Sequence, residues 1–240
     1  MAERPCVLVH GSWHGGWHWE EVAARLRSVG LRVFVPTLTG LAERGHEAAA
    51  DTDLSVHVRD VVSVIDDNDL KDVLLVGHSY GGMVITGAAN ARPSRIGKLV
   101  YLDAFVPRHG ESAATILGED FVRMAEAAAA QAGTPHLIPP LFTVEDSLGW
   151  TGELGAAFAA RMCPHPAATL HEPVRADGEL TAEQIFIRCN EHPLGLFDGY
   201  AAMARDSADW RYFELASRHD AVHLMPAAVA GILESLGEQE

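Results

Sequence analysis

A serine between glycines is the residue of this chain best placed to act as a nucleophile. Ser79 is the centre of the sequence GHSYG, residues 77–81, which follows the apolar run of residues 73–76. This G-x-S-x-G pattern is typical of a nucleophile elbow, a sharp turn between a strand and a helix that exposes the serine oxygen. Serine is a weak nucleophile without help. The hypothesis therefore requires a base, an acid that orients the base, and an oxyanion hole elsewhere in the chain.

His219 is the expected base. It follows the last strand-like run, residues 210–215, and active-site loops lie at the carboxyl ends of parallel strands. It also satisfies the chain order serine, acid, histidine that this kind of site uses. His223, four residues later, is the rival, but we expect it to begin the final helix.

Two backbone N–H groups are expected to form the oxyanion hole. One belongs to Tyr80, directly after the nucleophile, and the other to Ser12, in a glycine-rich loop after the first strand. Three histidines at positions 10, 14 and 18 have the spacing of a metal-binding helix face. Glycines at positions 11, 15 and 16 disfavour a continuous helix there, so we expect no metal.

Strand-like and helical runs alternate along most of the chain. Apolar strand patterns occupy residues 6–10, 31–35, 73–77, 98–106, 184–189 and 210–215, with helical periodicity between them. Such alternation predicts an α/β fold with a mostly parallel sheet and helices on both faces. The alternation lapses over residues 107–183, where alanine-rich helical runs at 121–132 and 154–162 predict an inserted helical cap. We expect one domain, residues 1–240, that carries this cap.

The composition narrows the possible partners. The 240 residues include 33 acidic and 18 basic side chains, a net charge of −15, and 48% of the residues are hydrophobic. An acidic surface repels phosphate backbones and anionic membranes. No apolar run approaches the roughly 20 residues of a membrane span. We expect a cytoplasmic protein with neither a nucleic-acid nor a membrane partner, and the sequence is compatible with a homodimer.

Several segments together resemble the α/β-hydrolase family. They are HGSWHGGW (residues 10–17), GHSYGG (77–82) and VYLDAFVP (100–107), with the spacing of His219 from Pro226 and the stretch 163–173. The branch they resemble holds plant methyl-ester esterases, hydroxynitrile lyases and bacterial esterase relatives. The resemblance covers nearly the whole chain and implies an α/β-hydrolase fold of about six strands that works without a cofactor.

Two positions favour the esterases over the lyases within that branch. The lyases carry a threonine after the strand-ending histidine and a lysine after the catalytic histidine, whereas this chain has Gly11 and Asp220 there. A lysine would stabilise a departing cyanide, and an aspartate would oppose it.

The acid departs from the family pattern. In the family, arginine and cysteine are followed by two residues and an aspartate, but residues 188–192 read RCNEH, so His192 takes the aspartate's place. Its neighbour Glu191 is our first expectation for the acid. Asp103, at the end of the strand after the elbow helix, is the alternative. A third possibility is a dyad in which no carboxylate orients His219.

These residues favour an esterase that cleaves a small or medium-sized apolar ester through an acyl-enzyme. The small-molecule partner would be an ester or a related carbonyl compound. The expected pocket residues are Gly11, Trp13, Phe105, Phe142 and Trp150. The alternatives are a biosynthetic carbon–carbon bond hydrolase, cyclase or lactonase on the same fold, and a catalytically silent small-molecule binder.

Overall fold

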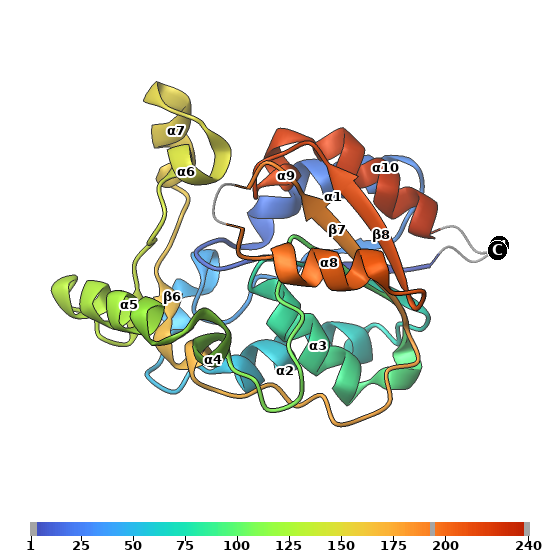
Figure 1. The fold of residues 1–240 in the computed structure, drawn as a ribbon, viewed down its shortest axis with the longest axis horizontal. Coiled ribbons are helices and arrows are strands. Elements are labelled where there is room, and N and C mark those ends of the chain that lie inside the picture. Colours follow the sequence, from blue (N-terminus) through green and yellow to red (C-terminus); the bar gives the residue numbers. More distant parts are fainter. Residues whose placement is uncertain (1–3, 193–194, 238–240) are drawn as a thin grey trace.

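The computed structural model describes residues 4–192 and 195–237 and contains a six-stranded parallel sheet (Figure 1). The order of the strands is β2-β1-β3-β4-β7-β8, and every neighbouring pair is parallel. The strands are β1 (Cys6–Val9), β2 (Val33–Phe34), β3 (Val73–His78), β4 (Ile96–Leu102), β7 (Glu183–Cys189) and β8 (Trp210–Leu215). The predicted α/β class is confirmed.

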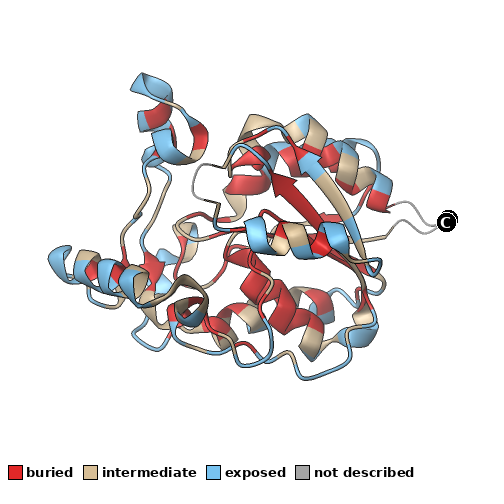
Figure 2. Ribbon diagram, viewed as in Figure 1, coloured by how far each residue is buried: buried red, intermediate tan, exposed pale blue. Residues whose placement is uncertain are grey.

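Helices cover both faces of this sheet, as buried parallel strands require. One layer contains α1 (Glu20–Ser28), α9 (Ala221–Leu224) and α10 (Pro226–Gly237), and the other contains α2 (Leu54–Asp67), α3 (Gly81–Ala91) and α8 (Asp198–Asp206). Figure 2 shows the buried residues along the strands and on the inner sides of the helices. In the described residues, no helix is both long and apolar enough to cross a bilayer.

A long segment between β4 and β7 interrupts the alternation. It contains α4 (Ala113–Leu117), α5 (Glu119–Gln131), α6 (Val144–Leu148), α7 (Gly152–Ala159) and the antiparallel pair β5 (Leu137–Ile138) and β6 (His165–Pro166). Figure 1 shows α5, α6 and α7 at one side of the molecule, away from the helices that cover the sheet. The strand before this segment, β4, ends at Leu102 and so is shorter at this end than the predicted run of residues 98–106, because Asp103 has a φ of +41°.

The turn between β3 and α3 is too tight for side chains at its glycines. A Cβ on Gly77 would lie 2.7 Å from the carbonyl carbon of Gly81, and a Cβ on Gly82 would lie 2.0 Å from the carbonyl oxygen of Phe105. Ser79, at the apex, has a φ of +55°, a region that non-glycine residues rarely occupy. The close approach of strand and helix therefore holds Ser79 in a strained conformation.

We expect Gly82→Ala to destabilise the protein by about 3 kcal/mol or more, because the added methyl group can only be accommodated by moving the backbone at Phe105. Urea unfolding followed by circular dichroism measures this change. Gly231→Ala is the matched control, since Gly231 lies in α10, is exposed and has nothing within 4 Å of the new Cβ. That variant should gain roughly 0.5–1 kcal/mol. Equal stabilities of the two variants would contradict this account of the turn.

Candidate active site

Ser79 is held by backbone hydrogen bonds between two adjacent strand ends. Its N–H donates to the Leu102 carbonyl at 3.4 Å, and its carbonyl accepts from the N–H groups of Gly82 at 3.1 Å and Phe105 at 3.2 Å. Leu102 ends β4, the neighbour of the Ser79 strand in the sheet. The serine therefore stands at the carboxyl edge of the sheet, the edge at which ligands bind in open α/β folds.

His219 reaches the same edge from the loop after β8, and its partner is Asp103. The His219 Nδ1 lies 2.7 Å from the Asp103 Oδ2. Since a carboxylate oxygen accepts, Nδ1 carries the proton, which leaves Nε2 as the basic atom. His219 and Ser79 line one cavity. The structure thus brings together a serine, a histidine and a carboxylate that holds the histidine in one tautomer.

The Asp103 carboxylate is fully buried and well supported. Its Oδ1 accepts from the Arg188 Nη1 at 2.7 Å and from the Cys189 N–H at 3.2 Å, both at the end of β7. Burial alone would raise the pKa of Asp103, but the contacts with His192 and His219 hold that pKa well below its usual range. The group is therefore ionised at neutral pH.

The expected pairing of Glu191 with His219 is wrong in this structure. Glu191 is exposed, and its backbone N–H donates to the Ser217 carbonyl at 3.0 Å, which fixes the chain with the side chain in solvent. The alternative acid named from the sequence, Asp103, has the contact instead. Asp103 directly follows β4, which lies next to β3 in the sheet. Its carboxylate therefore reaches His219 without any shift of the loop after β7.

His192, which replaces the family aspartate, also lies at this carboxylate. Its Nδ1 is 3.3 Å from the Asp103 Oδ2 but is not aligned for a hydrogen bond. The His192 ring stacks on the His219 ring at 4.7 Å between centroids, and Phe197 stacks on His219 at 5.2 Å. These flat contacts restrict the rotation of the imidazole. No role for His192 or Phe197 was predicted from the sequence, although the position of His192 in the family pattern was a signal that it would lie near the base.

The two expected oxyanion-hole residues lie beside Ser79. Ser12 and Tyr80 both line the cavity that contains the serine. Gly11 packs closely against the nucleophile, since a Cβ there would be 2.9 Å from the Ser79 Cβ. In the described residues, no hydrogen bond from the Ser12 or Tyr80 N–H to a protein acceptor occurs. The Tyr80 hydroxyl is engaged elsewhere, 2.9 Å from the His57 Nδ1, and burial raises the pKa of this phenol.

The cavity over Ser79 has a volume of about 300 Å³. Of the expected pocket residues, Gly11, Trp13, Phe105 and Phe142 line it. Trp150 does not, because its ring packs on Phe158 and His223 and borders a separate surface depression. The sequence did not identify the apolar side chains that line much of the remaining wall, namely Leu117, Phe121, Ile138, Leu141, Leu170 and Leu196.

Comparison with known proteins identifies the family of this chain. The pattern of the alpha/beta hydrolase family matches residues 6–232. The chain belongs to this family, and within it to the esterase-type enzymes. The resemblance noted from the sequence is thereby confirmed.

Three relatives indicate the branch. The carbendazim hydrolyzing esterase of Nocardioides sp. (strain SG-4G) is 37% identical over an alignment of 245 residues. The alignment covers 96% of this chain and 98% of that protein. Methylesterase 10 of Arabidopsis thaliana is 32% identical over 121 residues, 50% of this chain and 44% of its own. A solved structure, that of an extracellular alpha/beta-hydrolase from Paenibacillus species, has a TM-score of 0.83 and 25% identity to this chain. The comparison covers 98% of this chain and 100% of that chain. That protein is described as sharing structural and functional homology with tobacco salicylic acid binding protein 2.

Proposed function

We propose that the protein hydrolyses small or medium-sized apolar esters through an acyl-enzyme, with Ser79 as nucleophile, His219 as general base and Asp103 as the orienting acid. The observation that carries this proposal is the 2.7 Å contact between the His219 Nδ1 and the buried Asp103 carboxylate. That contact leaves the Nε2 of His219 free to take the proton of Ser79. It also supports the imidazolium that forms when the proton is transferred.

The proposed reaction has two halves. Ser79 Oγ attacks the ester carbonyl while His219 takes its proton, and the N–H groups of Ser12 and Tyr80 stabilise the oxyanion. His219 then protonates the leaving alcohol, so that the acyl group remains on Ser79. Water, deprotonated by His219, attacks the acyl-enzyme, and His219 returns that proton to Ser79 Oγ as the acid is released. Besides the substrate and water, the groups that take part are side chains and backbone of this chain.

The walls of the cavity support an apolar substrate. Aromatic and aliphatic side chains dominate its lining, and about 300 Å³ suits a compact molecule. The segment between β4 and β7 supplies Phe121, Ile138 and Phe142 to this lining, which supports its role as a cap over the site. The relatives suggest the first compounds to test, namely methyl esters and carbendazim.

The position of the acid was the reason to consider carbon–carbon cleavage, cyclisation or lactone chemistry instead. Asp103 fills the acid position from a neighbouring strand, so the displaced family aspartate no longer favours those reactions. A silent binder is disfavoured as well, because binding alone does not require a strained serine, an oriented histidine and a buried carboxylate together.

We expect a fluorophosphonate probe to label the protein once per chain, because an activated serine attacks the phosphorus and loses the proton to His219. Intact-mass spectrometry and peptide mapping should place the adduct on Ser79, and His219→Ala should slow labelling strongly. Ser28→Ala is a matched control, since this exposed serine lies at the end of α1 and should leave labelling unchanged. Failure to label the folded wild type, together with no turnover of simple methyl esters, would refute the proposal.

A further inference from the structure

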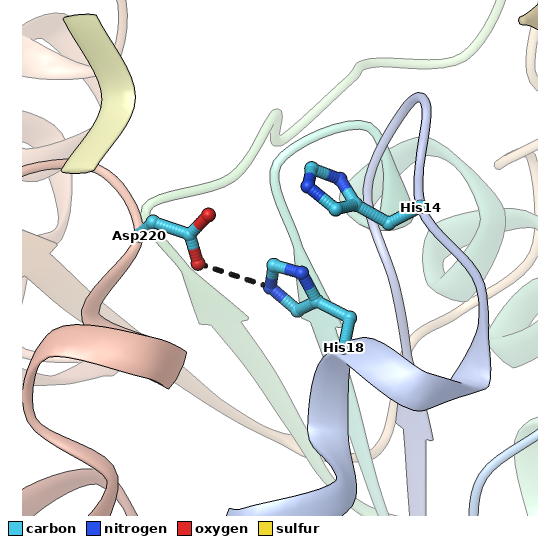
Figure 3. Close-up of side chains that lie close together, drawn as sticks. All are labelled: His14, His18 and Asp220. Atoms are coloured by element: carbon cyan, nitrogen blue, oxygen red, sulfur yellow. Dashed lines mark ion pairs between the residues drawn. The ribbon is translucent and has the colours of Figure 1, made fainter. Parts of the chain in front are cut away.

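A second group of polar side chains lies beside the catalytic cavity and takes no part in the proposed reaction. His14 and His18 follow β1, and Asp220 follows His219 in the chain. Figure 3 shows the Asp220 carboxylate and the two rings facing one another from opposite segments. The exposed fractions are 8% for His14, 1% for His18 and 2% for Asp220. The sequence predicted no metal at these histidines, but the structure adds Asp220 to His14 and His18, so three potential metal ligands converge in the interior.

The polar atoms of the three residues lie near one another, and the His18–Asp220 pair has the spacing of two ligands around one ion. Each residue offers one nitrogen or oxygen, and these three atoms lie within 4.8 Å of one another. The Asp220 Oδ1 is 3.2 Å from the His18 Nε2, yet this nitrogen makes no hydrogen bond. In a tetrahedral zinc site with bonds of about 2.0–2.1 Å, neighbouring ligand atoms are about 3.3 Å apart. The pair therefore has the separation of two ligands.

The contact of the second His14 ring nitrogen orients this ligand toward the other two residues, whereas neither ring nitrogen of His18 has a hydrogen-bond partner in the described residues. The His14 Nδ1 donates to the Ser12 carbonyl at 2.6 Å, which leaves the lone pair on Nε2, and this buried Nε2 has no partner. Metal-binding histidines usually donate their second ring N–H to a carbonyl or carboxylate in this manner. His223 approaches from the other side, with its Nδ1 3.3 Å from the Asp220 Oδ1, as an outer partner of the carboxylate.

The buried charge of Asp220 also lacks a cationic side chain. In the part of the chain that the structure describes, its ion-pair partners are His18 and His223, and no lysine or arginine pairs with it. A buried carboxylate is costly unless it is paired or coordinates a metal. A divalent cation between the carboxylate and the two imidazoles would supply the missing positive charge.

We propose that His14, His18 and Asp220 bind one divalent transition-metal ion of the zinc class. Two imidazoles and one carboxylate favour zinc, cobalt or nickel, whereas magnesium and calcium prefer oxygen ligands alone. His14 and Asp220 also line the catalytic cavity, so the fourth position of the ion can be filled from that side. The ion would join the loop of the oxyanion residue Ser12 to the loop of the base His219. Its role is to hold these loops together, and the proposal does not depend on the proposed esterase function.

The test is a zinc titration of the metal-stripped 240-residue protein. We expect isothermal titration calorimetry and elemental analysis to give one ion per chain, and zinc to raise the thermal unfolding temperature. Magnesium and calcium should give no shift. Cobalt bound at the site should give the strong visible absorption of a tetrahedral complex.

Two variants and a control assign the ion to these residues. Asp220→Asn keeps the shape of the side chain and removes its charge, and His18→Gln removes a nitrogen donor. Each should weaken zinc binding at least as much as the roughly 10–100-fold loss typical of an outer-shell change. His171→Gln should bind like the wild type, since the His171 side chain is 51% exposed and lies far along the chain in another segment.

Circular dichroism of each variant shows whether it is folded. Should His18→Gln unfold, the folded Asp220→Asn variant alone decides the question. The proposal fails if the wild type binds no zinc. It also fails if the wild type binds zinc without a change in its thermal unfolding temperature. It also fails if folded Asp220→Asn binds as tightly as the wild type, because the ion would then reside on other histidines.

Discussion

Asp103→Asn should lower kcat for ester hydrolysis by about 10⁴-fold, the loss seen when the orienting acid of a serine triad becomes an amide. The amide of asparagine can donate to the Nδ1 of His219, and this would favour the tautomer whose Nε2 carries the proton. Such a histidine cannot accept the proton of Ser79. Steady-state kinetics with a methyl ester measures the change.

Glu191→Gln is the matched control for this carboxylate. Glu191 was the first expectation from the sequence, but its side chain is exposed and His219 bonds to Asp103. The Glu191 variant should keep kcat within about twofold of the wild type. A large loss in Glu191→Gln together with near-normal rates in a folded Asp103→Asn variant would reverse the assignment of the acid. The unfolding curve of Asp103→Asn must be measured as well, because the substitution removes the buried charge that pairs with Arg188 and is expected to lower the stability of the protein.

Ser79→Ala should lower kcat by about 10⁶-fold, because the acyl-enzyme can no longer form. Binding should persist, since the cavity walls and the two oxyanion N–H groups remain. A combined Ser79→Ala and His219→Ala variant should lose little more than the single variant, because residues that act as one unit are strongly non-additive.

The measurement for this second prediction is burst kinetics and turnover with a chromogenic ester, on protein shown to be folded. Ser147→Ala is a useful control, since Ser147 also lines the cavity but has no part in the proposed chemistry. Multiplicative losses in the double variant, or a small loss in Ser79→Ala, would show that the serine and histidine do not work together.

Much of the fold could be predicted from the sequence because its signals are local. The apolar runs that became β1, β3 and β7 are buried on both faces, and Asp53 caps α2 through a hydrogen bond to the Val56 N–H. The end of β4 could not be predicted. The run of residues 98–106 is apolar on both sides of Asp103, and the positive φ that stops the strand there depends on tertiary contacts.

Some residues of the candidate site could also be predicted from the sequence, and others could not. Ser79, His219 and the loop of Ser12 could be placed from motif and chain order, because each follows a recognisable strand. The acid could not be chosen, because it depends on which carboxylate lies next to the His219 Nδ1 after strands far apart in sequence become neighbours. The same is true of Trp150, which is aromatic and in the expected segment but packs on Phe158 outside the cavity.

The location of the carboxylate at the end of β4 has a consequence for the evolution and redesign of this enzyme. Ser79 and Asp103 directly follow the adjacent strands β3 and β4, and backbone hydrogen bonds join Ser79 to Leu102 and Phe105 on either side of Asp103, so one edge of the sheet positions both the proposed nucleophile and the proposed acid. The stretch after β7 is thereby released from supplying the acid, while its residues Leu196 and Phe197 still border the cavity. Mutations of Leu196 should change the cavity wall while they leave Asp103 and the rings stacked on His219 in place, which makes this position a suitable one for laboratory diversification.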